Sequence, residues 1–210
     1  MAFYDTASGD FSEFSISFTH NPLSDFGIFA KGYRTAARTT TTQIINQLQK
    51  DRRFSDYLAY PVVFLYRHSF ELYLKNIIYW AILLVNLRGT EVEEKLQNTH
   101  DLTSLADKAK NFFFRAFPEE NGFRDIFDNI TITAKEFSNI DPNSYSYRYP
   151  VDTTGNHSTN QKQSISLAAF ANHMENILEE LDTISFGLNV ECSIANEDRQ
   201  YIAEELQEIS

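Results

Sequence analysis

Residues 62–88 read VVFLYRHSFELYLKNIIYWAILLVNLR and contain neither proline nor glycine. A run without breakers predicts one continuous helix, about 40 Å long at about 1.5 Å per residue. Ser55 and Asp56 are suitable residues to cap it, and Pro61 fits only near its start. Apolar side chains occur almost all round this helix, which indicates that other helices or a second copy of the chain cover it.

Four further helices are predicted from apolar residues at helical spacing. Asp25 and Asp101 can cap two of them, and Pro118 ends the helix that Asp101 caps. The expected ranges are 26–51, 102–117, 123–140 and 164–186, with a last amphipathic piece after residue 196 and a plausible short strand at 186–194. We therefore predict an all-α, up-and-down bundle of four to five helices around one long central helix. Residues 1–24 would form an irregular N-terminal arm, and residues 25–210 a single domain.

Composition excludes several classes of protein. Hydrophobic residues make up 42% of the chain, which is enough for a large core. The single cysteine, Cys192, can form no disulfide within the chain, and the first 21 residues lack a signal-peptide pattern, so we expect a cytoplasmic protein. The most apolar stretch, residues 77–87, is shorter than the roughly 20 residues that cross a bilayer, so we expect no membrane segment.

The net charge of −11 is distributed unevenly. Residues 26–53 carry six bases and one acid, whereas residues 163–210 carry ten acids and one base. Such asymmetry could steer an anionic ligand to one side or let two copies associate head to tail. The alternative is that both segments are simply solvated helix faces.

A group of polar residues interrupts the apolar central helix: Arg67, His68, Glu71 and Lys75. At about 100° per residue, all four fall within a single arc of the helix. The surrounding sequence is apolar, so we expect Glu71 to be buried and bonded to a neighbouring base. Arg67 and Lys75 should lower the pKa of His68 and favour its neutral, base-competent form. The group is either a self-satisfied ladder of salt bridges or a functional site.

Residues 141–163 form a long loop, and loops of this length in compact domains are usually functional or mobile. The loop contains YSYRYPVD at 145–152 and then His157. Arg148, with Tyr147 beside it, could stack on a base and hold a phosphate. Alternatively, the rings pack on the helices and Arg148 pairs with Glu71 or Asp152.

Three short motifs resemble the HEPN superfamily, the helical domains of prokaryotic toxin–antitoxin, phage-defence and nucleotidyltransferase-linked systems. They are RHxxELxLK at 67–75, HDLxxL at 100–105 and RYPxD at 148–152, and the similar region covers about residues 55–185. The resemblance implies a usually dimeric helical bundle and, in active members, a metal-independent ribonuclease. The positions that it carries over are Arg67, His68, Glu71, Lys75, His100, Asp101, Arg148 and Asp152.

One element of the active members is absent from this sequence. They carry an arginine followed, after about four to six residues, by a histidine, and no arginine here has that spacing. We therefore favour a dimeric module that binds a nucleotide, RNA or a partner protein such as an antitoxin at the polar cluster of Arg67, His68, Glu71 and Lys75. The alternatives are a non-standard ribonuclease, with His68 or His157 as base and Arg148 as phosphate clamp, and a purely structural scaffold. No cofactor is expected, and five scattered histidines with one cysteine suggest no metal site.

Overall fold

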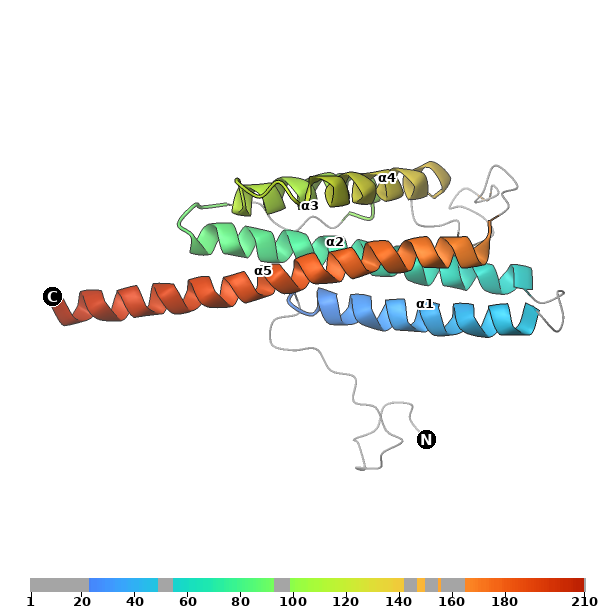
Figure 1. Cartoon of the computed structure of the whole chain (residues 1–210), viewed down its shortest axis with the longest axis horizontal. Helices are drawn as coiled ribbons and strands as arrows, with labels where there is room; N and C mark the ends of the chain where they lie inside the picture. The colour runs from blue at the N-terminus through green and yellow to red at the C-terminus, as the bar shows by residue number, and fades with distance from the viewer. Residues whose placement is uncertain are drawn as a thin grey trace, which may run out of the picture.

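The chain forms a bundle of long helices (Figure 1) in a computed structural model that describes residues 23–48, 55–92, 99–141, 147–149, 155 and 165–209. The described helices are α1 (Phe26–Leu48), α2 (Ser55–Leu87), α3 (Leu102–Ala116), α4 (Arg124–Ile140) and α5 (Leu167–Ile209). No strand occurs within these ranges, so the predicted all-α bundle is confirmed. The expected N-terminal arm lies almost entirely outside the described residues, as does most of the 141–163 loop.

The central position of α2 is confirmed. It packs against α1, α5 and α3, while α4 lies against α3 (Figure 1). The sequence predicts that either other helices or a second copy of the chain cover the apolar residues of α2. In the structure, helices of the same chain cover them. The buried apolar residues of α2 are Val62, Val63, Tyr66, Phe70, Leu72, Tyr73, Leu74, Ile77, Ile78, Ala81, Leu84 and Val85.

The ranges of α3 and α4 agree closely with those predicted from the sequence. The Asp101 carboxylate accepts from the backbone N–H of Thr103 at 3.0 Å and of Ser104 at 3.4 Å, which confirms it as the N-cap of α3. The apolar faces of the two helices meet around Phe113, whose ring contacts those of Phe114, Phe117, Phe123 and Phe127. This pair of helices forms a layer over α2.

The expected end of the fifth helix at residue 186 is wrong, and so is the short strand at 186–194. The sequence FGLNVECSI alternates in polarity, which suggests a strand, but α5 continues through it to Ile209. The helix continues because its buried stripe does: Leu181, Ile184, Leu188 and Cys192 recur at helical spacing. The Cys192 Sγ also donates to the backbone oxygen of Trp80 at 3.3 Å, which ties this part of α5 to α2.

Among the described residues, α2 is the one helix whose length and composition would allow it to cross a membrane. A window within Tyr57–Leu87 has a mean hydropathy of 1.3, and 67% of that window is buried against the rest of the chain. The helix is longer than the apolar stretch 77–87 on which the expectation of no membrane segment rests. The buried core helix of a water-soluble protein can have the same length and composition.

Two glycines of α1 give a matched test of how closely α1 and α2 approach. A β-carbon at Gly27 would lie 2.9 Å from Nδ2 of Asn76, which is buried and donates to Ser185 Oγ. We expect Gly27→Ala to destabilise the fold by roughly 1–3 kcal/mol through overpacking. At Gly32 a β-carbon would meet nothing within 4 Å, so Gly32→Ala should stabilise by about 0.5–1 kcal/mol. Urea unfolding measures both, and equal effects would contradict the close contact.

Candidate functional site

The polar residues of α2 form a buried cluster around Glu71, which is 1% exposed. Its Oε1 accepts from Lys75 Nζ at 2.9 Å and lies 2.8 Å from His100 Nδ1, while Oε2 accepts from Arg67 Nη1 at 3.4 Å. The expectation that Glu71 is buried and bonded to a neighbouring base is confirmed. Its histidine partner is His100, at the start of α3, and no bond to His68 is among its contacts.

The other end of the cluster is closed by Asp141, which directly follows α4. Arg67 is 1% exposed, and its Nε lies 3.5 Å from Asp141 Oδ2. Arg67 Nη2 also donates to the backbone oxygens of His100 at 3.2 Å and Asp141 at 3.5 Å. Burial lowers the pKa of Arg67, although the charges of Asp141 and Glu71 offset part of that effect. The cluster thus joins α2 to the start of α3 and the end of α4.

The charges of the buried cluster balance. Arg67 and Lys75 face Glu71 and Asp141, and all four side chains are at least nine-tenths buried. Burial raises the pKa of Glu71, but the hydrogen bonds and charges of Lys75 and His100 together lower it by more. The pKa of Glu71 therefore lies below the usual value. A neutral, internally bonded group of this kind holds neighbouring elements in place more readily than it binds a charged ligand.

The ring contacts of His68 are with α1 and with its own helix. Its ring meets that of Tyr33 edge-on, with centroids 4.5 Å apart, and stacks on Phe64 at 5.6 Å and 8°. Burial is the main cause that lowers the pKa of His68, with further lowering from the charges of Lys75 and Arg67. The predicted direction of the shift is therefore confirmed, with burial and not the neighbouring charges as its main cause, and the shift favours the neutral form of His68.

The same Phe64 ring also contacts Arg148 from the loop. The guanidinium carbon of Arg148 lies 5.7 Å from the centroid of Phe64 and 5.6 Å from that of Tyr149. Arg148 and Tyr149 are both exposed. Phe64 therefore brings together His68 and Arg148, the two residues that the sequence singles out for catalysis.

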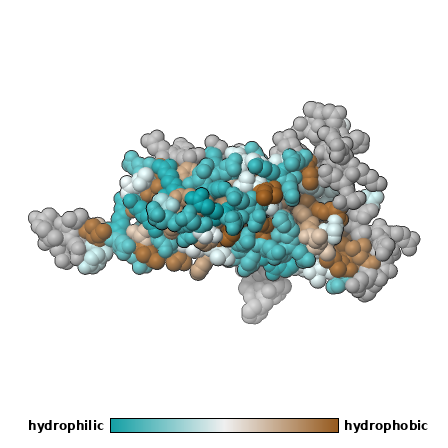
Figure 2. All heavy atoms as spheres, turned by 45° about the horizontal axis from the view of Figure 1, so that its top comes forward, coloured by the Kyte–Doolittle hydropathy of each residue, from teal (hydrophilic) through white to brown (hydrophobic). Residues whose placement is uncertain are grey.

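Two more tyrosines extend this surface toward the start of α2. Tyr57 is 81% exposed and Tyr60 is 51% exposed, and both precede Phe64 and His68 at helical spacing along one side of α2. Figure 2 shows hydrophobic residues near the end of the bundle where α1 ends and α2 begins, beside a mainly hydrophilic surface. We refer to the residues of this surface as the aromatic face: Tyr57, Tyr60, Phe64, His68, Arg148 and Tyr149.

The remaining predicted site residues have other roles or lie outside the description. The Asp101 carboxylate is occupied as the cap of α3. Tyr147 packs against the core, and burial raises its pKa to about 12, so it contributes to packing more than to binding. Asp152 and His157 lie outside the described residues. The sequence-based prediction does not include Asp141, Phe64 or Tyr33. Of these, Phe64 could have been predicted, because it precedes His68 by four residues on the same helix.

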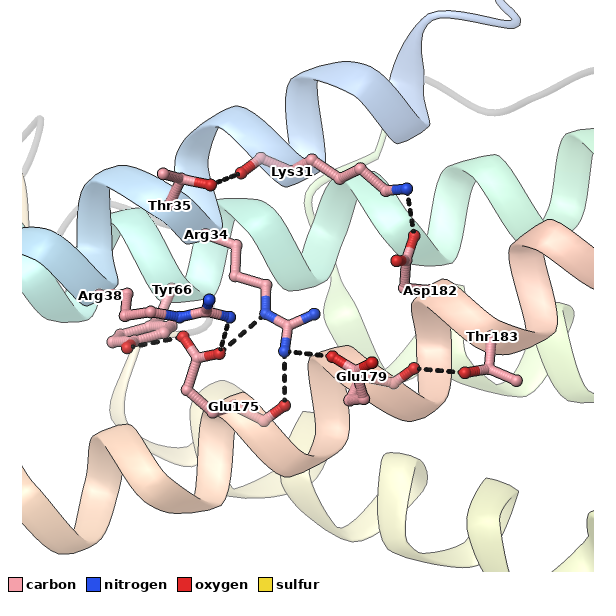
Figure 3. Close-up of polar contacts among 9 residues, drawn as sticks. All are labelled: Lys31, Arg34, Thr35, Arg38, Tyr66, Glu175, Glu179, Asp182 and Thr183. Carbon is pink, nitrogen blue, oxygen red and sulfur yellow. Dashed lines mark hydrogen bonds and ion pairs between the residues drawn. The ribbon is translucent and has the colours of Figure 1, made fainter.

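A second polar group, the α1–α5 clasp, accounts for much of the charge asymmetry (Figure 3). Glu175 accepts from Arg34 Nε at 2.9 Å, from Arg38 Nη2 and from the Tyr66 hydroxyl at 3.0 Å. Arg34 Nη2 also donates to Glu179 at 2.6 Å. Burial raises the pKa of Tyr66 to about 12, so this hydroxyl stays protonated as a donor.

The clasp corrects the interpretation of the basic and acidic segments. Lys31 completes it with an ion pair to Asp182 at 3.1 Å, so three of the six bases in residues 26–53 pair with acids of α5. These charges join two helices and are neither a steering field nor merely solvated faces. The matching three- and four-residue spacing of bases on α1 and acids on α5 is the sequence signal for this pairing.

No family model, curated protein or solved structure matches this chain. Within the part of the chain that the structure describes, no group of three or more His, Cys, Asp or Glu side chains is placed to hold a metal ion.

Proposed function

We propose that this chain is a helical domain that binds single-stranded RNA or a nucleotide through the aromatic face. The observation that carries the proposal is the contact of one ring, Phe64, with both His68 and Arg148. Exposed rings accept bases by stacking, at about 1–3 kcal/mol per base, whatever the sequence. A guanidinium beside them pairs with phosphate. The buried cluster supplies rigidity by joining α2 to the start of α3 and the end of α4.

A distant relationship to the HEPN superfamily remains part of this proposal. Residues from the HEPN-like motifs, Arg67, Glu71, Lys75 and His100, contact one another in the buried cluster, and Arg148 reaches the same region of α2. The all-α bundle is compatible with that superfamily. A role in prokaryotic defence or a toxin–antitoxin system, and a cytoplasmic location, follow from the resemblance and the composition as proposals.

A metal-independent ribonuclease is the second candidate, and one observation favours it. His68 is neutral, because burial lowers its pKa, and it shares Phe64 with the cationic Arg148. A neutral imidazole near a phosphate-binding cation is the minimum for attack by a ribose 2′-hydroxyl. Arg148 lies on a loop and contacts the rings of Phe64 and Tyr149, an arrangement better suited to recognition than to acid–base catalysis.

Purified protein should bind fluorescein-labelled single-stranded RNA weakly and leave it intact in EDTA. We expect anisotropy to rise with protein concentration and the affinity to fall as salt increases, because phosphate contacts release counterions. A denaturing gel of the same samples should show full-length RNA. Fragmentation that disappears in both His68→Ala and Arg148→Ala would establish the ribonuclease instead. Absence of both binding and fragmentation would favour a purely structural scaffold.

A homodimer also remains a proposal. The buried apolar residues of α2 are covered by helices of the same chain, so the interface would use exposed residues instead. Light scattering at micromolar concentration should give twice the chain mass of 24.3 kDa, and a monomeric mass would contradict this.

A further inference from the structure

The free end of α5 projects beyond the rest of the bundle (Figure 1). Cys192 is the last buried residue of the helix, and every described side chain from residue 196 to 204 is exposed. At about 1.5 Å per residue, the projecting part from residue 196 to Ile209 is about 20 Å long. We refer to residues 196–209 as the overhang. It lies at the opposite end of the bundle from the aromatic face (Figure 1).

A groove of about 620 Å³ opens at the base of the overhang, between α5 and the C-terminal end of α2. Its apolar lining comes from Leu87 of α2 and from Ile194, Ala195 and Ile202 of α5. Ile194 is 49% exposed and Ile202 is 56% exposed. Tyr201, on the same part of α5, is 62% exposed. These exposed apolar side chains border the groove and leave it open to a partner that can cover them.

The groove itself carries a small negative charge. Glu91, Glu191 and Asp198 line it, against Arg88 and Arg199. Arg88 donates to Ala116 O at 2.6 Å and pairs with Glu191 at 2.8 Å, so these two charges offset each other and leave Glu91 and Asp198 against Arg199. The overhang adds four more acids by sequence and no further base: Glu197, Glu204, Glu205 and Glu208.

We propose that the groove and overhang of α5 form a docking site for a basic, amphipathic helical segment of another protein. A helix fits because the groove runs along α5 and offers apolar residues at helical spacing, which is how amphipathic helices are recognised. The segment must be basic because the overhang carries five acids and one base. The same count disfavours a second copy docked here, since two overhangs would bring like charges together, and it disfavours nucleic acid.

The probe is a fluorescein-labelled helical peptide of leucine and lysine in amphipathic order, added to the full chain. Two control peptides are a scrambled sequence of the same composition and a version with glutamate in place of lysine. Ile194→Ser and Asp198→Lys should each weaken binding at least about tenfold. Ile132→Ser and Asp125→Lys, at exposed positions of α4, should leave it unchanged.

Four outcomes would overturn the proposal. Three come from the titrations: no binding of the leucine–lysine peptide, equal binding of the glutamate version, and an equal loss of affinity in the α4 variants. The fourth comes from light scattering: a dimer that Ile194→Ser converts to monomers would assign the surface to a second copy. All four substitutions are at exposed positions, and circular dichroism of each variant checks that it folds.

Discussion

Replacing Glu71 with alanine is expected to lower the free energy of unfolding by roughly 3–5 kcal/mol. The carboxylate is 1% exposed and bonded to Lys75, Arg67 and His100. Its removal would leave Arg67 and Lys75 buried with Asp141 as their remaining carboxylate within the cluster. Urea unfolding of the variant and the parent protein measures the loss.

Glu179→Ala is the matched control for this prediction. Glu179 also pairs with an arginine, but its side chain is 67% exposed, so we expect a loss below about 1 kcal/mol. Similar losses for the two variants would contradict the view that Glu71 belongs to a dry, buried cluster.

The stabilisation by Glu71 should also depend on pH. Its pKa in the folded protein is lowered, so the unfolded chain binds the proton more readily. The stabilisation is therefore complete above the unfolded pKa of about 4.5 and is lost as pH falls through the lower, folded pKa. The difference in stability between the parent protein and Glu71→Gln should shrink over that acidic range. A difference independent of pH there would indicate that the carboxylate is already protonated in the folded protein.

Phe64→Ala is expected to weaken binding of single-stranded RNA by roughly 5- to 150-fold, the equivalent of about 1–3 kcal/mol or one stacked base. The reason is that the change removes the half-buried ring against which Arg148 and His68 lie. Arg148→Ala should weaken binding by a similar factor. The double variant should lose little more than either single variant, because the two side chains act as one unit. Anisotropy titrations at one salt concentration give all four affinities.

Phe186→Ala provides the matched control, since Phe186 is 69% exposed on α5 and lies outside the aromatic face. Its affinity for RNA should equal that of the parent protein. If it loses as much as Phe64→Ala, binding is a property of exposed rings in general and not of this surface.

Much of the fold is predictable from the sequence because long apolar stripes leave few alternatives. The helices α3 and α4 match their expected ranges closely, and the unbroken run on α2 correctly predicts a central helix. The error on α5 has a physical cause: over nine residues, FGLNVECSI fits a strand as well as a helix. Packing of Leu188 and Cys192 in the bundle decides between them.

For the candidate site, the sequence predicts contacts between residues of the same helix but not contacts between helices. The arc on α2 correctly indicates that Arg67, Glu71 and Lys75 meet. It does not indicate that Asp141 and His100 complete the group, because those residues approach only through the packing of α3 and α4 on α2. The separation of His68 from the cluster has the same origin, since Tyr33 and Phe64 provide its alternative partners.

Photo-crosslinking tests the central claim, RNA binding at the aromatic face, most directly. A short single-stranded RNA containing thiouridine is irradiated with the full chain, and the modified peptides are identified by mass spectrometry. We predict adducts on Tyr57, Tyr60, Phe64 or Tyr149, and their loss when unlabelled RNA competes. Adducts confined to α3, α4 or the overhang of α5 would contradict the account.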